Sequence, residues 1–133
     1  MQAEVKWVGG SKFLGTSGSG HHIVMDSNAG EHAPGAMEMV LMAAGGCSST
    51  DVVFDLRKAG QKVRDCVAQL TAQRRETAPR LFTQIHIHFV VSGEDLDPEL
   101  VERITAASLA EHCSVCLMLG KGVEMTHSWE IAD

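Results

Sequence analysis

The sequence has no tyrosine, only three prolines, and few aromatic residues of any kind, which make up 5% of its 133 residues. Any apolar pocket is therefore expected to be lined by aliphatic side chains and by the seven methionines. Long hydrophobic runs are also missing. The longest stretch without a charged or strongly polar residue, 39–47, is about half of the ~20 residues that a bilayer crossing needs, so we expect no membrane span.

Basic residues are scarce, because eleven lysines and arginines stand against seventeen acidic residues and give a net charge of -6. No cluster of lysines and arginines exceeds the pair Arg74 and Arg75, which argues against a nucleic-acid partner. The N-terminus has neither a basic start nor an apolar stretch ending in small residues, so we expect no secretory signal and a cytoplasmic protein. The length favours a single domain over residues 1–133.

The hydrophobic pattern changes its period several times along the chain. Alternation and glycine turns predict three short strands in the first thirty residues. Helical spacing predicts a long helix over 36–59, closed by Gly60. A hairpin (62–76 and 80–91), a helix from 97 to about 113, a short helix (115–119) and a strand (123–131) follow. This order predicts an α+β fold with a mostly antiparallel sheet, a long central helix and a second, C-terminal helix.

The first half of the long helix, 37–47, is apolar or small on every side apart from Glu38. A helix of this kind must be covered on every side, whereas one small sheet covers a single face. Since the chain is short, we expect a second copy to supply the other layer, which predicts a homodimer.

Four cysteines stand in this chain, and redox chemistry, metal binding or plain burial can each explain them. Cys47 lies in the middle of the long helix, after small residues that let a substrate or a partner helix approach the sulfur. The alternative is a buried free thiol that acts as a small hydrophobic side chain. Cys66 shares a strand face with Ala68 and Leu70, so we interpret it as a core residue.

Cys113 and Cys116 form a Cys-x-x-Cys motif behind His112. This spacing indicates a redox pair or half of a zinc site, although the thioredoxin-like setting is missing. A zinc site made by these three residues with Cys47 stays an alternative. Two further histidines, at 86 and 88, point the same way from one predicted strand, but no third ligand is indicated by spacing, so no metal is predicted there.

Two carboxylates are candidates for a site around Cys47. Asp51 is four residues further on and shares its helix face, where it could orient a group beside the sulfur. Glu38 is nine residues earlier, which is about 13 Å along the axis and on the opposite side. Glu38 could therefore approach Cys47 only between packed antiparallel helices of two subunits.

Residues 33–53, which surround Cys47, and residues 111–115, which surround Cys113, resemble motifs of the OsmC/Ohr family of osmotically inducible and organic hydroperoxide resistance proteins, and within it the YhfA-like subgroup. The similarity extends over essentially the whole chain. It implies the OsmC-like fold as an intertwined homodimer, in which two central helices pack together and two active sites lie at the interface. It also implies a peroxidase with Cys47 as the peroxidatic and Cys113 as the resolving cysteine.

The expected function is thus thiol-dependent reduction of organic hydroperoxides or hydrogen peroxide, with Cys47, Cys113, Glu38 and Asp51 in the site. No bound cofactor is expected, and an external dithiol such as dihydrolipoamide would reduce the disulfide. The resemblance also implies an activating arginine from the N-terminal strands, yet none precedes Arg57. We therefore expect slow activity at neutral pH that rises toward about pH 9. The alternative function is a dimer that binds a small apolar ligand without turnover.

Overall fold

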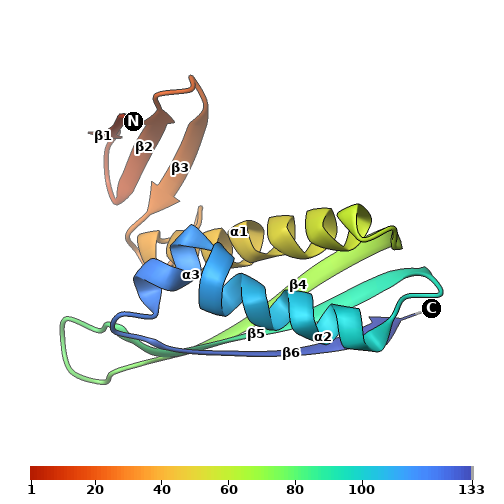
Figure 1. The fold of residues 1–133 in the computed structure, drawn as a ribbon. Coiled ribbons are helices and arrows are strands. Elements are labelled where there is room, and N and C mark those ends of the chain that lie inside the picture. The colour runs from red at the N-terminus through yellow and green to blue at the C-terminus, as the bar shows by residue number, and fades with distance from the viewer. Residues whose placement is uncertain (133) are drawn as a thin grey trace. The chain divides into compact units, whose positions relative to one another are not determined.

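The computed structural model describes residues 1–132, and its contacts divide the chain into two compact units, Met1–Val40 and Leu41–Asp133. Each unit has its own three-stranded sheet (Figure 1). The expectation of a single domain stays a prediction, whereas the expected α+β class is confirmed. The elements run β1 (Ala3–Trp7), β2 (Lys12–Ser17), β3 (His22–Asp26), α1 (Ala36–Lys58), β4 (Lys62–Arg74), β5 (Phe82–Glu94), α2 (Pro98–Ala107), the π-helical turn η1 (Ser108–His112), α3 (Ser114–Leu119) and β6 (Glu124–Ala132).

The N-terminal unit is a β1-β2-β3 sheet with antiparallel pairing throughout, as the alternating pattern and the glycine turns predict. Gly9 and Gly10 form the first turn with φ values of 101° and 56°, which lie in the left-handed region that glycine tolerates best. Few apolar side chains of this sheet are covered. Val5 exposes 60% of its surface and Trp7 63%.

A buried carboxylate holds the loop between β3 and α1. Asp26 is fully buried and accepts hydrogen bonds from the Ser11 hydroxyl (2.6 Å) and from the backbone N–H groups of Asn28 (2.8 Å) and His32 (3.0 Å). These donors satisfy the buried charge, and they tie the loop back onto the small sheet.

Helix α1 begins and ends at local sequence signals. The Glu38 carboxylate accepts a hydrogen bond from the backbone N–H of Gly35 (3.0 Å), as in half of a capping box. Gly60, with a φ of 83°, follows the last turn. One face of the helix is buried, and it carries Ala44, Gly45, Ser48, Val52 and Leu56. On other sides Met42 and Phe54 expose 50% and 54% of their surfaces, so the described chain does not cover α1 all round.

By length and composition alone, α1 is apolar enough to cross a membrane, which the charge-free run 39–47 did not suggest. Core helices of soluble proteins meet the same criterion. The second half of α1 carries four charged residues, which are rare within membrane-spanning segments. They are Asp51, Asp55, Arg57 and Lys58.

The larger unit packs its helices on one face of the β4-β5-β6 sheet. β4 pairs with β5 in antiparallel fashion, and β6 pairs with β5 in parallel. The inner face of β5 contributes the centre of the core with Ile85, Ile87, Phe89 and Val91, all with 0% exposure. α1 and α2 cover this face (Figure 1). The indole N–H of Trp129 on β6 donates to the Glu102 carboxylate of α2.

The C-terminal helical segment is interrupted, whereas the sequence predicts one helix up to about residue 113. Asp97 caps α2 by accepting the backbone N–H of Glu99 (3.0 Å). After α2 the backbone widens into η1, where the N–H of Cys113 donates to the Ser108 carbonyl (2.7 Å). This turn sets the direction in which the chain enters α3.

Candidate active site

Cys47 lies half-buried in the middle of α1, where the helix approaches the sheet closely. A Cβ atom at Gly45 would stand 2.6 Å from Leu70 Cδ1 of β4, so only glycine fits without a shift of that leucine. A Cβ atom at Gly46 would meet nothing within 4 Å. The small residues therefore have two effects, since Gly45 brings α1 onto β4 and Gly46 leaves the surface next to Cys47 open.

Cys47 lies close enough to Cys113 to raise the pKa of the Cys113 thiol, although 65 residues separate them in the chain. Cys113 is fully buried and caps α3, because its sulfur accepts the backbone N–H of Cys116 (3.3 Å). The Cys116 thiol is 1% exposed and points back to α1, with its sulfur 3.9 Å from the Ala44 carbonyl oxygen. Three thiols from α1 and from the start of α3 thus form one cluster, the thiol cluster Cys47, Cys113 and Cys116.

Both buried thiols of the cluster are held in the protonated form. Burial raises the pKa of Cys113 well above its ordinary value of 9.0, and the contact with Cys47 raises it further. Burial is also the main reason that the pKa of Cys116 is raised, with smaller contributions from the nearby Cys47 and Asp51. Neither thiol is a good nucleophile at neutral pH until a neighbour takes its proton.

Asp51 is fixed beside the cluster by a residue that sequence reasoning did not select. The Ser108 hydroxyl donates to the Asp51 carboxylate (2.9 Å), which joins η1 to α1. Ser108 is fully buried, and its sequence signal was only its place on the buried stripe of the preceding helix. The π-helical hydrogen bond to Cys113 starts from the same residue, so Ser108 positions both the carboxylate and the entry into α3.

The other predicted site carboxylate, Glu38, has a local partner. One of its oxygens accepts the Gly35 N–H at the start of α1. A role for Glu38 toward Cys47, which would need a second subunit, stays a prediction.

A family model described as OsmC-like protein matches residues 28–128, which include the whole thiol cluster. The chain is also 58% identical over 131 residues to Protein YhfA of Escherichia coli strain K12, which covers 98% of each chain. The chain belongs to the OsmC-like family. One solved structure from structural genomics is 56% identical and superposes with a TM-score of 0.95, over 99% of this chain and 98% of that one. The organic hydroperoxide resistance protein OhrB of Bacillus subtilis is 18% identical with a TM-score of 0.64, over 98% of both chains, which shows the shared fold.

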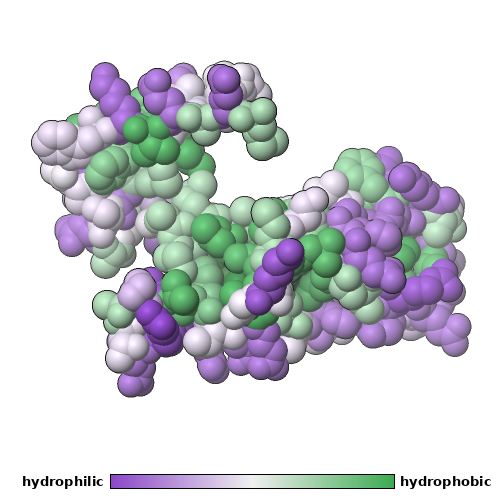
Figure 2. Space-filling view, turned by 60° about the vertical axis from the view of Figure 1, so that its left-hand side comes forward, coloured by the Kyte–Doolittle hydropathy of each residue, from purple (hydrophilic) through white to green (hydrophobic). Residues whose placement is uncertain are grey.

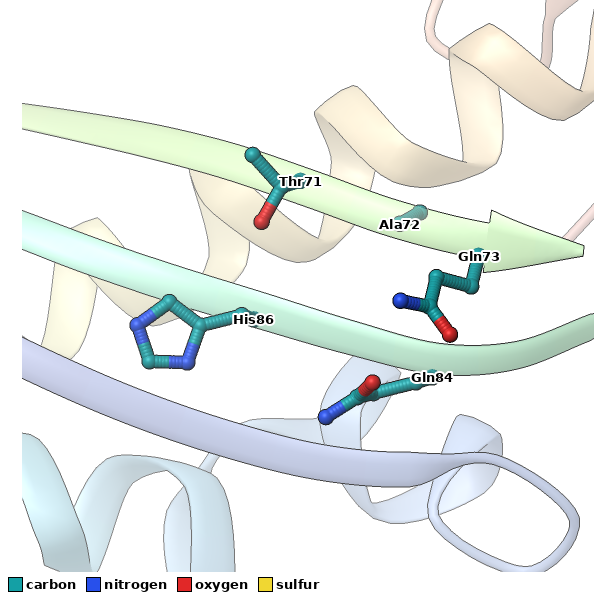
Figure 3. Close-up of a pocket in the computed structure, with 5 residues that line it drawn as sticks. All are labelled: Thr71, Ala72, Gln73, Gln84 and His86. Carbon is teal, nitrogen blue, oxygen red and sulfur yellow. The ribbon is translucent and has the colours of Figure 1, made fainter.

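The two histidines singled out in the OsmC-like sequence lie on the face of the larger sheet that is opposite α1. His86 contacts the hydroxyls of Thr126 and Ser128 (both 2.7 Å), and His88 contacts Ser128 (2.7 Å) and the Glu130 carboxylate (3.1 Å). All four ring nitrogens are therefore engaged. His86 also lines a shallow pocket of about 340 Å³ together with Thr71, Ala72, Gln73 and Gln84 (Figure 3).

Metal ligation finds no support in the part of the chain that the structure describes. Within residues 1–132, no group of three or more histidine, cysteine or acidic side chains is arranged to hold a metal ion. The zinc site of Cys47, Cys113, Cys116 and His112 stays an alternative. Cys66, predicted to be a core residue, is half-buried on β4, and burial is the main reason that its pKa is raised.

Proposed function

We propose that this OsmC-like protein is a thiol peroxidase that reduces organic hydroperoxides, with Cys47 as the attacking and Cys113 as the resolving thiol. The observation that carries the proposal is the contact between the half-buried Cys47 and the fully buried Cys113. A peroxide can approach the first sulfur, while the second is protected from direct oxidation. The name of the structural neighbour OhrB supports organic hydroperoxides as the substrate class.

The proposed reaction has two covalent steps. The Cys47 thiolate attacks the outer peroxide oxygen, the O–O bond breaks, and the alcohol leaves after taking a proton, so that Cys47 becomes a sulfenic acid. The Cys113 sulfur then attacks Cys47, the S–O bond breaks, and water leaves as the disulfide forms. A cellular dithiol such as dihydrolipoamide reduces the disulfide, and no bound cofactor takes part.

The polar and apolar surroundings of Cys47 suit a substrate with one polar end. Asp51, held by Ser108, is the nearer carboxylate that could orient the hydroperoxide group. Phe54, seven residues after Cys47 on nearly the same face of α1, is exposed and offers apolar surface for the organic part. No arginine precedes Arg57, so the cationic candidates earlier in the sequence are Lys6, Lys12, His21, His22 and His32.

We further propose that the active form is a cytoplasmic homodimer. Hydrophobic residues reach the surface in a green region bordered by polar side chains (Figure 2). Among the exposed large hydrophobic side chains are Met42 and Phe54 on α1, and Leu117 and Met118 on α3, which expose 41% and 65% of their surfaces. A second copy of the chain would cover the apolar face of α1, and it would bring Glu38 of one subunit toward Cys47 of the other.

The decisive experiment follows the consumption of cumene hydroperoxide and of hydrogen peroxide with dithiothreitol or dihydrolipoamide as the reductant. We expect turnover by the wild-type protein, faster with the organic substrate, and loss of turnover in Cys47→Ser. In Cys113→Ser the first step remains, so the Cys47 sulfenic acid should accumulate and react with dimedone. Turnover should rise with pH, because the raised pKa of Cys113 makes its thiolate scarce at neutral pH.

Cys66→Ser is the matched control, because Cys66 lies on β4 outside the thiol cluster, and it should retain wild-type turnover. Absence of consumption by the wild-type protein with either reductant would contradict the proposal. It would leave the alternative function, a dimer that binds a small apolar ligand without turnover.

A further inference from the structure

The two-thiol reaction leaves Cys116 without a role, although Cys116 is part of the thiol cluster. Its backbone N–H donates to the Cys113 sulfur (3.3 Å) and its own sulfur faces the Ala44 carbonyl of α1. The charges of Cys47 and Asp51 act on it at short range. Any disulfide between Cys47 and Cys113 would therefore form beside a third thiol.

We propose that Cys116 is a third redox thiol, which accepts the disulfide from Cys47 by exchange at Cys113. The inference rests on the proposed peroxidase function and extends it by one step. The exchange converts a disulfide between α1 and α3 into one within the Cys113-Ser-Val-Cys116 motif, and it returns Cys47 to the thiol form.

The step is a thiol–disulfide exchange that needs no further oxidant. The Cys116 sulfur attacks Cys113, the Cys113–Cys116 bond forms, and the Cys47–Cys113 bond breaks. Cys47 leaves as a thiolate and takes up the proton that Cys116 releases. The oxidising equivalent comes from the hydroperoxide consumed earlier, and the number of disulfides stays at one.

Local geometry favours the new bond. A disulfide requires Cα atoms within about 7 Å, and residues three apart at the start of a helix meet this condition. Cys113 stands at the cap of α3 with extended backbone, φ -77° and ψ 109°, and its sulfur already faces the first turn. By contrast, the disulfide of the first cycle joins two different helices and must hold them at a fixed separation.

Burial determines what the exchange achieves. Cys113 and Cys116 expose 0% and 1% of their surfaces, so an external dithiol reaches neither sulfur directly. Cys47, which is half-buried, is the only member of the cluster that solvent can reach within the described chain. After the exchange the oxidising equivalent is stored inside, and Cys47 can react with a second hydroperoxide before any reductant arrives. Reduction would run in reverse, through attack by Cys47 on Cys113.

The first test maps disulfides after treatment with one equivalent of cumene hydroperoxide and no reductant. We expect the Cys113–Cys116 linkage and a free Cys47 in the wild-type protein and in the control Cys66→Ser. We expect the Cys47–Cys113 linkage in Cys116→Ser, and Cys116→Ala serves if the serine variant does not fold. A wild-type protein that stops at the Cys47–Cys113 linkage would overturn the inference.

A second test uses diamide, which oxidises thiol pairs without any peroxide and so separates this inference from the proposed function. We expect rapid Cys113–Cys116 formation in the wild-type protein and loss of that rapid phase in Cys47→Ser, because the buried pair is then cut off from solvent. If Cys47→Ser forms the linkage as fast as the wild-type protein, exchange through Cys47 is wrong. If hydroperoxide leaves Cys47 unmodified while diamide gives the expected pattern, the peroxidase proposal fails and the third redox thiol stands.

Discussion

Burial raises the pKa of both Cys113 and Asp26, but only in Asp26 do hydrogen bonds outweigh it. In Cys113 burial dominates and raises the pKa, because the thiolate would lose its hydration. In Asp26 the hydrogen bond from the Ser11 hydroxyl is the largest influence, and with the backbone N–H of Asn28 it lowers the pKa against the effect of burial. Asp26 accepts three hydrogen bonds that stabilise its charged form, whereas the single N–H of Cys116 does not offset the burial of Cys113.

The lowered pKa of Asp26 makes the stability of the N-terminal unit depend on acid pH. A carboxyl whose folded pKa is below its ordinary value of 3.8 stabilises the folded state fully above that value. The contribution is lost as the pH falls through the lower folded value. We expect acid unfolding of the small sheet, measured by Trp7 fluorescence in a Trp129→Phe background.

Asp26→Asn is the matched variant for this measurement, since it keeps the shape and removes the titration. It should be less stable than the parent at neutral pH and should have a flatter acid profile. An acid transition of unchanged steepness in Asp26→Asn would mean that another group is responsible.

At the scale of elements, α1 packs closely against β4 because Gly45 has no side chain. A Cβ atom at Gly45 would overlap the end of the Leu70 side chain. We expect Gly45→Val to lower the free energy of unfolding by roughly 1–3 kcal/mol, the usual cost of overpacking. Chemical denaturation of the single variants Gly45→Val and Leu70→Ala, and of the double variant, gives the coupling between the two positions.

The double variant decides whether Leu70 is the cause. Removing the leucine side chain makes room for the valine, so the two effects should be less than additive by about 1 kcal/mol. Strict additivity would show that Gly45 is needed for another reason, such as backbone conformation.

Local signals were enough to predict most of the elements. Gly60 ends α1, Asp97 and Pro98 start α2, and strict alternation over β6 predicts a half-buried strand. The π-helical turn was missed, because Ser108 and His112 continue the helical pattern and only tertiary contacts with α1 distinguish the two geometries. The parallel pairing of β6 with β5 could not be predicted either, because the alternation within a strand is the same whether its neighbour is parallel or antiparallel.

The candidate site divides in the same way. Motif resemblance selected Cys47 and Cys113, and the structure places them in contact. Cys116 entered only as half of a Cys-x-x-Cys motif, because its approach to α1 depends on the turn that precedes α3. Ser108 could not be selected from the sequence, because its role depends on the hydrogen bond that it donates to the Asp51 carboxylate of another helix.

For the whole molecule, the two sheets differ in how completely a single chain covers their apolar side chains. The larger sheet buries one face under its own helices, and its core residues are fully covered. A three-stranded sheet needs a covered apolar face for independent stability. In the N-terminal unit, Ile23 and Val24 of β3 still expose 45% and 43% of their surfaces. The proposed second copy is the natural candidate to cover them.

Because apolar side chains of the small sheet are exposed in a single chain, the stability of its fold should depend on protein concentration. If a second copy covers it, each tenfold rise in protein concentration should raise the apparent melting temperature. The Trp7 signal should then report dissociation and unfolding as one event, while Trp129 reports the later melting of the larger unit. Sedimentation equilibrium at micromolar concentration should give a dimer, and a monomer with a melting temperature that ignores dilution would contradict the assembly. Under this scheme, a cell that makes little of the protein would hold it with its first thirty residues unfolded and open to proteases.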